Sequence, residues 1–341
     1  MPTIKDVARL ANVSTATVSR VVNTPEHVTL ETKLKVQQAI VDLKYIPNAN
    51  ARQLVKDDKV MIGVVLSELS DPFNATIVHE VEHFARQLGI QVLVSTGCSN
   101  KSKEIQAVLR LQADGCNSVI IYSVALSDLE LLQLSKEVKG LIVLNRFISD
   151  IASRCLSFDN QAGAALATEY LLSNGHQNIA IVSANNKPVD AKKRLNGIKS
   201  TFEKHRRQLN QTNIEYGESN FWGGYSCAEQ LLKKTQTFSA VLCFNDSMAV
   251  GVIAKLRQAG ICIPQQISVV GFDDLVIAQK CEPPLTTIHY PVNIMARKAV
   301  EVAWNIISQQ NNLNESGYQY FPVLKLRSST QTIVSPHNEN N

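Results

Sequence analysis

Residues 3–23 read TIKDVARLANVSTATVSRVVN, and their pattern predicts two short helices joined by a tight turn. In the first helix, over about residues 4–11, apolar residues recur at helical intervals. Asn12 follows, and asparagine tolerates the left-handed backbone conformation that a tight turn needs. A second helix over roughly 15–22 completes the pattern, so this stretch has the form of a helix-turn-helix.

A third helix, over about residues 31–43, completes a small three-helix domain with little core of its own, and Pro47 stops the helical pattern. Ser14 or Thr15 is expected to cap the second helix. The residues expected to face inward are Val18, Val21 and Val22 in the second helix and Leu34, Ala39, Ile40 and Leu43 in the third.

The positive charge of the chain is concentrated at its N-terminal end. Residues 1–56 hold eight Lys/Arg and four Asp/Glu, a net charge of +4, which equals the formal net charge of all 341 residues. A basic head on a neutral body favours a polyanionic partner for the head alone, although so small an excess also arises by chance.

From residue 60 onward, short apolar strands alternate with helices of ten to fifteen residues. This alternation predicts parallel sheets with right-handed crossovers, in two doubly wound lobes. Ligands of such folds lie beyond the carboxyl ends of the strands, so we expect an interlobe cleft. The predicted strands are 60–66, 91–95, 118–122, 141–144, 179–182, 240–244 and 268–271, and the predicted helices are 74–88, 102–113, 162–174, 190–205, 224–234, 246–259 and 292–309.

The expected fold class is therefore α/β, with a small all-α helix-turn-helix head and a two-lobed, doubly wound parallel-sheet body. The Asn- and Ala-rich segment that follows the head has no strong apolar face and is interpreted as a linker that can become helical. The predicted domains are a head at 1–47, a hinge at 48–58, a body at 59–335 with lobes of about 59–160 and 161–335 and C-terminal segments that cross back, and a disordered tail at 336–341.

Composition narrows the class of protein. Hydrophobic residues make up 45% and charged residues 19% of the chain, which suits a globular protein with a sizeable core. The longest apolar runs have the length of a strand, and the first residues show no secretion signal. The seven cysteines are odd in number and have no C-x-x-C spacing, which favours free thiols in a reducing cytoplasm.

Short motifs recur along almost the whole chain. Beside residues 3–23 there is a hinge-like YIPNANAR at 45–52, and the body carries SDPF at 70–73, NR at 145–146, FND at 244–246, GFDD at 271–274 and PLTT at 284–287. Together these motifs resemble the lactose/galactose repressor family of bacterial transcription regulators from about residue 3 to 330. The body also resembles periplasmic sugar-binding proteins.

The resemblance implies a second helix that lies in the major groove of operator DNA. Residues Thr15, Ala16 and Arg20 then read base edges: Arg20 donates to guanine, and Ala16 offers a methyl contact to thymine. Contacts that position the head are implied for Thr3, Ser14, Thr17, Ser19 and Asn23. A purely structural alternative leaves Ser14 and Thr15 as helix caps, a role that is compatible with DNA contact.

In this family the hinge folds on the operator and inserts a leucine into the minor groove. Leu54 holds the matching position, with Asn48 and Ala51 as further DNA-contacting residues. Without the resemblance, Leu54 would be expected only to pack against the body.

Sugar recognition needs planar polar side chains that bond two hydroxyls each and an aromatic face against the ring. The effector-binding residues implied by the motifs are Asp71, Phe73, Asn145, Arg146, Arg194, Phe221, Trp222, Asn245 and Asp273. Either Phe221 or Trp222 is expected to supply the aromatic platform. The resemblance implies a monosaccharide effector, such as galactose.

Each of these residues also has a structural interpretation. Asp71 and Asp246 follow strands and could simply cap the next helices. Arg194 ends the basic run 192–194, and such runs usually lie in solvent, as we expect for 204–207. His176 is expected at the end of a helix rather than in a catalytic role.

Three functions compete. The first is a ligand-controlled DNA-binding repressor, a homodimer on a palindromic operator, with a nucleoside- or purine-responsive repressor as a variant. The second is a transport-type sugar-binding protein, which would need a signal peptide and no basic head. The third is an enzyme, but the sequence contains no G-x-G-x-x-G, P-loop or G-x-S-x-G motif. We therefore expect no catalysis, no cofactor and no metal.

Overall fold

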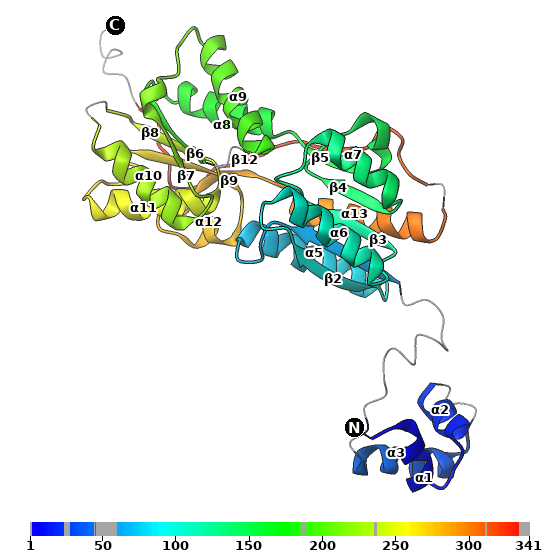
Figure 1. Cartoon of the computed structure of the whole chain (residues 1–341). Helices are drawn as coiled ribbons and strands as arrows, with labels where there is room; N and C mark the ends of the chain where they lie inside the picture. Colours follow the sequence, from blue (N-terminus) through cyan, green and yellow to red (C-terminus); the bar gives the residue numbers. More distant parts are fainter. Residues whose placement is uncertain are drawn as a thin grey trace, which may run out of the picture. The chain divides into compact units, whose positions relative to one another are not determined.

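The computed structural model describes residues 2–23, 28–43, 45, 60–185, 188–234, 237–310 and 312–333. The chain divides into two compact units, at 1–59 and 60–341. Figure 1 shows an all-helical first unit and a larger second unit in which helices surround two sheets. The predicted hinge, with Asn48, Ala51 and Leu54, and the predicted tail lie outside the described residues.

The first unit consists of α1 (Ile4–Leu10), α2 (Thr15–Asn23) and α3 (Leu30–Asp42). Asn12, in the turn between α1 and α2, has a φ of 52°, which is the left-handed conformation predicted for it. Ser14 caps α2, because its Oγ accepts a hydrogen bond from the Thr17 backbone N–H at 3.0 Å. The two helices and their turn thus form the predicted helix-turn-helix.

The core of this unit is small and apolar. Val7, Val18 and Val36, one from each helix, are fully buried and belong to one cluster. The prediction for Leu34 was wrong, because its side chain is 57% exposed. Val36 and Ala39 lie on the buried face of α3, and two residues along a helix turn a side chain about 200° away from that face.

The first sheet of the second unit has the strand order β11-β5-β4-β3-β1-β2, with every neighbouring pair parallel. Its strands are β1 (Met61–Leu66), β2 (Gln91–Thr96), β3 (Ser118–Ile121), β4 (Leu141–Leu144), β5 (Cys155–Phe158) and β11 (Tyr318–Tyr320). Its helices are α5 (Pro72–Gln87), α6 (Lys101–Ala113), α7 (Asp128–Glu137), the 3-10 helix η2 (Ser149–Arg154) and α13 (Val292–Ile307).

Alternation along the strands assigns side chains to two cores. Ile62 and Val64 of β1 cluster with residues of α5 and α13, whereas Val65 clusters with residues of α6 and α7. Both faces of the sheet are therefore covered by helices, which explains why its central strands are almost uniformly apolar.

The second sheet has the order β12-β10-β9-β8-β6-β7, and β12 is antiparallel to β10. Its strands are β6 (Ile179–Ala184), β7 (Ile214–Gly217), β8 (Ala240–Cys243), β9 (Ser268–Asp273), β10 (Thr286–His289) and β12 (Val323–Lys325). Its helices are α8 (Asn160–Ser173), α9 (Val189–Lys204), the 3-10 helix η3 (Gln211–Asn213), α10 (Phe221–Leu232), α11 (Asp246–Gln258) and α12 (Val276–Lys280).

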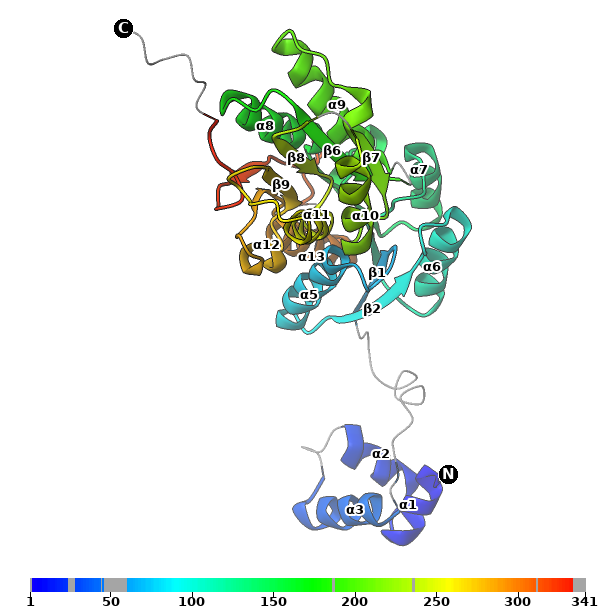
Figure 2. The same ribbon diagram turned by 90° about the vertical axis from the view of Figure 1, so that its left-hand side faces the viewer.

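The chain passes between the two sheets three times: from β5 to α8, from β10 to α13, and from β11 to β12. As a result, α13 packs beside α5 on the first sheet although it follows a strand of the second (Figures 1 and 2). The two-lobed parallel-sheet architecture and the seven predicted strands are confirmed. Five strands of only three or four residues, β5, β7, β10, β11 and β12, were not predicted.

Candidate effector site and DNA-reading helix

The carboxyl ends of the strands in both lobes carry polar side chains, and several of these side chains meet. From the first lobe come Asp71 after β1 and Asn145 after β4. From the second come Arg194 in α9, after β6, and Asp273 at the end of β9. This is the edge where doubly wound sheets bind ligands.

Arg194 lies at the centre of this group, and its side chain is 6% exposed. Its Nε donates to Asn160 Oδ1 at 2.9 Å, its Nη1 donates to the Phe244 carbonyl, and its Nη2 lies 3.5 Å from Asp273 Oδ1. The guanidinium also stacks on the Phe272 ring, 3.6 Å from its centroid. The structural alternative for Arg194, a solvated basic run, is therefore excluded: packing of α9 against the sheet buries Arg194 while its neighbour Lys192 stays exposed.

A relay of hydrogen bonds continues from Arg194 to the first lobe. Asn160 Nδ2 donates to Asn145 Oδ1 at 2.7 Å, and Asn145 Nδ2 donates to the Tyr122 hydroxyl at 3.2 Å. The Tyr122 hydroxyl in turn donates to Asp190 Oδ2 of α9, also at 3.2 Å. The relay therefore ties the carboxyl ends of β3 and β4 to a helix of the second lobe.

Four carboxyl groups, those of Asp71, Asp190, Asp246 and Asp273, lie near one another at this edge. Burial raises the pKa of Asp273 well above its usual range, the Arg194 charge opposes that rise, and the charges of Asp246, Asp71 and Asp190 add to it. Burial also raises the pKa of Asp71, whose Oδ1 accepts from the Phe73 backbone N–H at 2.9 Å. Protons are thus held more tightly here than on free aspartates, as is common at ligand sites.

Aromatic rings form one wall of the group. Phe73 packs edge-on against Tyr122, with ring centroids 5.5 Å apart, and against Tyr290 at 4.9 Å. Tyr290 also packs on Phe158, at 4.3 Å. The aromatic surface beside the polar relay therefore comes from Phe73 and from rings that the sequence analysis missed.

The predicted platform residues, Phe221 and Trp222, are the first two residues of α10. Trp222, at the start of α10, is 70% exposed, and its ring packs against Phe221 at 5.0 Å and Tyr225 at 5.9 Å. Asn245 caps α11 by accepting from the Met248 backbone N–H at 2.8 Å, and its Nδ2 donates to the Ser219 carbonyl at 3.0 Å. It thereby holds the loop before α10 near the strand ends.

Arg146 is buried, but its partners belong to the first lobe alone. Its Nη1 donates to Asp128 Oδ1 at 2.7 Å, and its Nη2 donates to the Leu126 carbonyl at 3.0 Å. The Arg146 guanidinium is thus directed to the start of α7, whereas the side chain of the preceding residue, Asn145, belongs to the relay.

Asp71 caps α5, as its structural interpretation predicted, but the corresponding interpretation of Asp246 was wrong. Asn245 is the cap of α11, and Asp246 is the first helical residue, fully buried. His176 lies beyond the end of α8, where its Nδ1 is 3.0 Å from Ser239 Oγ and its Nε2 is 3.0 Å from the Gln331 carbonyl. These bonds give His176 a structural role.

The missed relay residues Tyr122, Asn160 and Asp190 carried a usable signal. Tyr122 directly follows β3, and Asn160 and Asp190 open the helices after β5 and β6. The relay residues could therefore have been predicted as polar or hydroxyl-bearing residues directly after strands. Asn160 was missed because β5 itself was not predicted.

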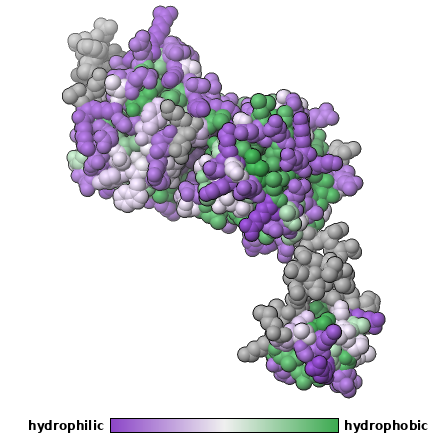
Figure 3. Space-filling model, viewed as in Figure 1, coloured by the Kyte–Doolittle hydropathy of each residue, from purple (hydrophilic) through white to green (hydrophobic). Residues whose placement is uncertain are grey.

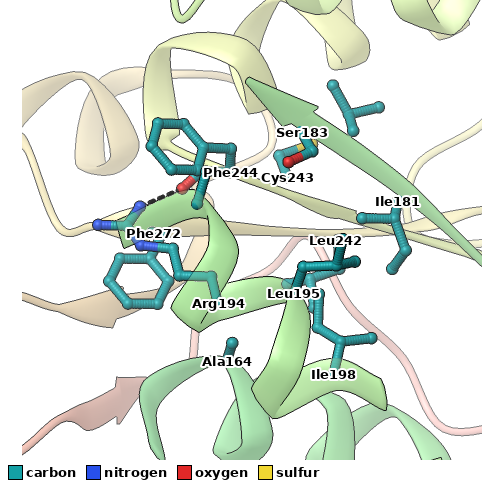
Figure 4. Close-up of a pocket in the computed structure, with 12 residues that line it drawn as sticks. Ala164, Ile181, Ser183, Arg194, Leu195, Ile198, Leu242, Cys243, Phe244 and Phe272 are labelled. Carbon is teal, nitrogen blue, oxygen red and sulfur yellow. Dashed lines mark hydrogen bonds between the residues drawn. The ribbon is translucent and has the colours of Figure 1, made fainter. Parts of the chain in front are cut away.

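A small cavity of about 20 Å³ lies beneath Arg194, between α9 and strands β6 and β8. Figure 4 shows Ile181, Leu195, Ile198 and Leu242 around it, with the Arg194 guanidinium directed to the Phe244 carbonyl. This volume is about that of one water molecule, and the lining is largely apolar. The cavity therefore reflects imperfect packing around the Arg194 stem rather than a sugar site.

One pair of histidines has the spacing of a known metal-binding motif, which the expectation of no metal did not consider. Residues 79–83 read HEVEH, which matches the H-E-x-x-H pattern of zinc sites. His79 and His83 lie exposed on α5 with ring centroids 6.4 Å apart. Within the described part of the chain, no group of three or more His, Cys, Asp or Glu side chains is arranged to hold a metal ion.

The head presents the predicted reading residues on its surface. Thr15, Ala16 and Arg20 of α2 are exposed, while Val18 of the same helix is buried. The Ser14 and Thr17 hydroxyls bond each other at 2.8 Å, so Ser14 caps the helix and still lies exposed. Thr3 is exposed at the start of α1, where its N–H and hydroxyl both donate to Asp6 Oδ2.

A helix-turn-helix head joined to a two-lobed body with a convergent polar site defines the class of ligand-controlled DNA-binding regulators. Comparisons with known proteins agree. Residues 3–48 match the model of "Bacterial regulatory proteins, lacI family", and residues 59–321 match that of "Periplasmic binding proteins and sugar binding domain of LacI family". The chain belongs to the LacI family, which confirms the resemblance.

Individual relatives span nearly the whole chain. It is 36% identical to GalR, an HTH-type transcriptional regulator of Escherichia coli (strain K12), over 97% of this chain and 96% of that one. It is 38% identical to GalS of Salmonella typhimurium (strain LT2) over 89% of each chain. The lac repressor dimer bound to operator and the anti-inducer ONPF is similar in structure, with a TM-score of 0.79, 30% identity and coverage of 97% of this chain and 99% of that one.

Among the described residues, no helix has the length and apolar character needed to span a membrane.

Proposed function

We propose that this protein is a cytoplasmic transcriptional repressor that binds a palindromic operator as a homodimer and releases it when a monosaccharide such as galactose binds between the lobes. The observation that carries the proposal is the buried Arg194–Asp273 pair, in a chain that also has a helix-turn-helix head. Hydrogen bonds through the side-chain amides of Asn160 and Asn145 connect this pair to the first lobe. Regulation rather than catalysis is the role of its named relatives GalR and GalS.

The chemistry of the site suits a sugar. Arg194, Asn145 and Asp273 offer planar donors and acceptors, each able to bond two hydroxyls, and Phe73 offers an aromatic face. We assign the effector contacts to these four residues, with Asp71 and Asn245 at the margin. Because Arg146 is directed to Asp128 and Trp222 to solvent, we do not include them among the contacts.

Control of DNA binding follows from the position of the site at both lobes. A ligand that contacts both lobes favours their closed arrangement, and closure moves the segments that lead to the two hinges of the dimer. The hinges, with Leu54, then fit the operator less well, which is a population shift set by differential affinity.

A screen of ligands tests the proposed effector. D-Galactose, D-ribose, adenosine and hypoxanthine are added separately, and the melting temperature of the whole protein is recorded. We expect D-galactose to raise it most and to release a palindromic operator in a gel shift. A shift with the purine compounds alone would instead identify a purine-responsive repressor; the transcriptional repressor PurR of Histophilus somni (strain 129Pt) is 31% identical to this chain over 98% of its length.

Replacing Arg20 by alanine should weaken operator binding and leave sugar binding unchanged. Arg20 is exposed on α2, where its guanidinium can bond one guanine. The expected loss is about 1–3 kcal/mol, with relaxed preference at one base pair in each half-site. Binding to a panel of operator variants measures this. Equal weakening on every sequence would show that Arg20 contacts phosphate instead.

Deleting residues 1–58 should leave a dimeric body. The second unit has its own cores, and large apolar side chains remain exposed on it, among them Leu129 (74%), Trp222 (70%) and Val276 (71%). Figure 3 shows hydrophobic side chains between hydrophilic ones on the surface of this unit. Sedimentation velocity gives the mass in solution, and a monomeric body would contradict the prediction.

A further inference from the structure

Asp246 is a buried carboxylate beside the proposed effector site that none of the contacts described above uses. It is fully buried at the start of α11. Its Oδ2 accepts from the Leu275 backbone N–H at 2.8 Å, and its Oδ1 accepts from the Thr287 hydroxyl at 2.5 Å. Asp246 therefore joins three segments: the helix after β8, the turn after β9 and strand β10.

The turn that Asp246 holds has an unusual backbone. Asp273 has a φ of 111°, a value that side-chain-bearing residues adopt only when their surroundings enforce it, and Asp274 has a φ of 60°, in the left-handed region that aspartate tolerates. Leu275, whose N–H bonds Asp246, comes directly after them. Asp274 is fixed separately, by Arg327 at 2.5 Å and His289 at 2.9 Å.

The neighbouring strand leaves room for this carboxylate. A Cβ atom at Gly271 would lie 2.3 Å from Asp246 Oδ1, far inside contact distance. The absence of a side chain at position 271 therefore allows the Asp246 carboxylate to reach both of its donors. The same strand carries Asp273 two residues later.

We propose that Asp246 is a positioning residue of the effector site: by anchoring Leu275 and Thr287, it holds the strained Asp273–Asp274 turn so that the Asp273 carboxylate meets Arg194 and the sugar. This proposal rests on the proposed function, since it concerns how the same site binds its ligand. Asp246 acts through Asp273 and not by contact with the sugar.

Electrostatics links the two carboxyl groups as well. Burial raises the pKa of Asp246 to about 7, against the hydrogen bonds from Thr287 and Leu275, and the charge of Asp246 in turn raises the pKa of Asp273. The other charged or titratable groups facing Asp246 are Asp273 and Asp274 from the turn, Arg327 after β12, Cys243 of β8 and Cys281 after α12. Since the sugar hydroxyls donate to ionised Asp273, we expect affinity to rise with pH as Asp273 loses its proton.

Two substitutions at Asp246 separate its geometry from its charge. Asp246→Ala removes both anchors, and we expect the affinity for D-galactose to fall about tenfold or more. Asp246→Asn keeps both contacts, because the amide oxygen accepts from Leu275 N–H and the amide N–H donates to Thr287 Oγ1. It should bind D-galactose within about threefold of the wild type.

The charge effect has its own readout. Above about pH 7, where Asp246 of the wild type is ionised, Asp246→Asn removes its negative charge, so the pKa of Asp273 falls and the midpoint of the pH–affinity curve moves to lower pH. Calorimetric titration of the full-length protein with D-galactose between pH 5 and pH 8 measures both effects. An unchanged midpoint in this variant would overturn the electrostatic part of the proposal.

Controls separate positioning from loss of folding. Thr287→Val removes one anchor and should weaken D-galactose less than Asp246→Ala does. Ser118→Ala removes a buried hydrogen bond to the Gly140 carbonyl at the opposite end of the first sheet, and should leave affinity unchanged. If Asp246→Ala does not fold, Thr287→Val and Gly271→Ala, whose methyl group would displace the carboxylate, carry the test.

Failure of the proposed function and failure of the positioning role of Asp246 give different results. A wild-type protein that binds neither D-galactose nor D-ribose would contradict the proposed function, and the role of Asp246 with it. Wild-type binding that Asp246→Ala or Thr287→Val leaves unchanged, or that Ser118→Ala weakens equally, would overturn the positioning role alone.

Discussion

Replacing Asp273 by alanine is expected to give a protein that still binds its operator but is no longer released by sugar. Asp273 is 5% exposed, lies at the carboxyl end of β9 and faces Arg194. An ionised carboxylate there accepts two hydroxyl donors, and bonds to charged groups are the stronger kind. Their loss should weaken D-galactose by about 3 kcal/mol or more, roughly a hundredfold.

Calorimetry of the free variant with D-galactose measures that loss, and an operator gel shift with and without sugar measures the response. Asp273→Asn is the matched control: it keeps the shape and one acceptor, so it should bind more weakly than the wild type and more tightly than the alanine variant. Linkage adds a check on the wild type, because operator DNA should weaken the sugar by the factor by which the sugar weakens the operator. Unchanged affinity in Asp273→Ala would remove this residue from the site and make Asp274 the next candidate.

The position of Asp273 could be predicted because a strong local pattern precedes it. An apolar run that ends in Gly271-Phe272-Asp273 indicates a buried strand followed by a polar residue, and parallel strands bring such residues to one edge. Asn145, which the family motifs implied, likewise directly follows an apolar strand, Leu141–Leu144. The head was equally accessible, since Asn12 and Ser14 mark its turn and cap locally.

The partners of these residues depend on tertiary packing that the local pattern does not record. Tyr122 directly follows β3, and Tyr290 directly follows β10. Their ring contacts come from segments that are distant in sequence, and β10, which positions Tyr290, has only four residues. The aromatic residues that the family motifs implied, Phe221 and Trp222, cluster with Tyr225 on α10.

The burial of Arg194 could have been predicted from the sequence of α9. Arg194 is the third of three consecutive basic residues, a pattern typical of a solvent-exposed helix face. Its position, however, follows Ala191 by three residues and precedes Ile198 by four, which is the spacing of one helix face. All three are buried along one side of α9. Helical periodicity would therefore have predicted a buried Arg194, which the charge pattern alone did not.

Replacing Arg194 by alanine should abolish sugar binding and also lower the free energy of unfolding by about 3–5 kcal/mol, the range for breaking a buried ion pair from one side. The variant leaves Asp273 Oδ1, Asn160 Oδ1 and the Phe244 carbonyl without their donor. It also removes the planar group that stacks on Phe272. Urea unfolding monitored by circular dichroism gives the stability, and calorimetry gives the affinity.

Two neighbouring variants make the result specific to Arg194. Lys192→Ala, in the same basic run but exposed, should change stability by no more than about 0.5 kcal/mol and leave sugar affinity intact. Arg194→Lys keeps the charge but not the planar fork, which alone can serve Asn160, Phe244 and Asp273 together, so most of the affinity should still be lost. If Arg194→Ala were as stable as Lys192→Ala and bound D-galactose normally, the buried network would be dispensable, and the effector site would have to lie elsewhere in the body.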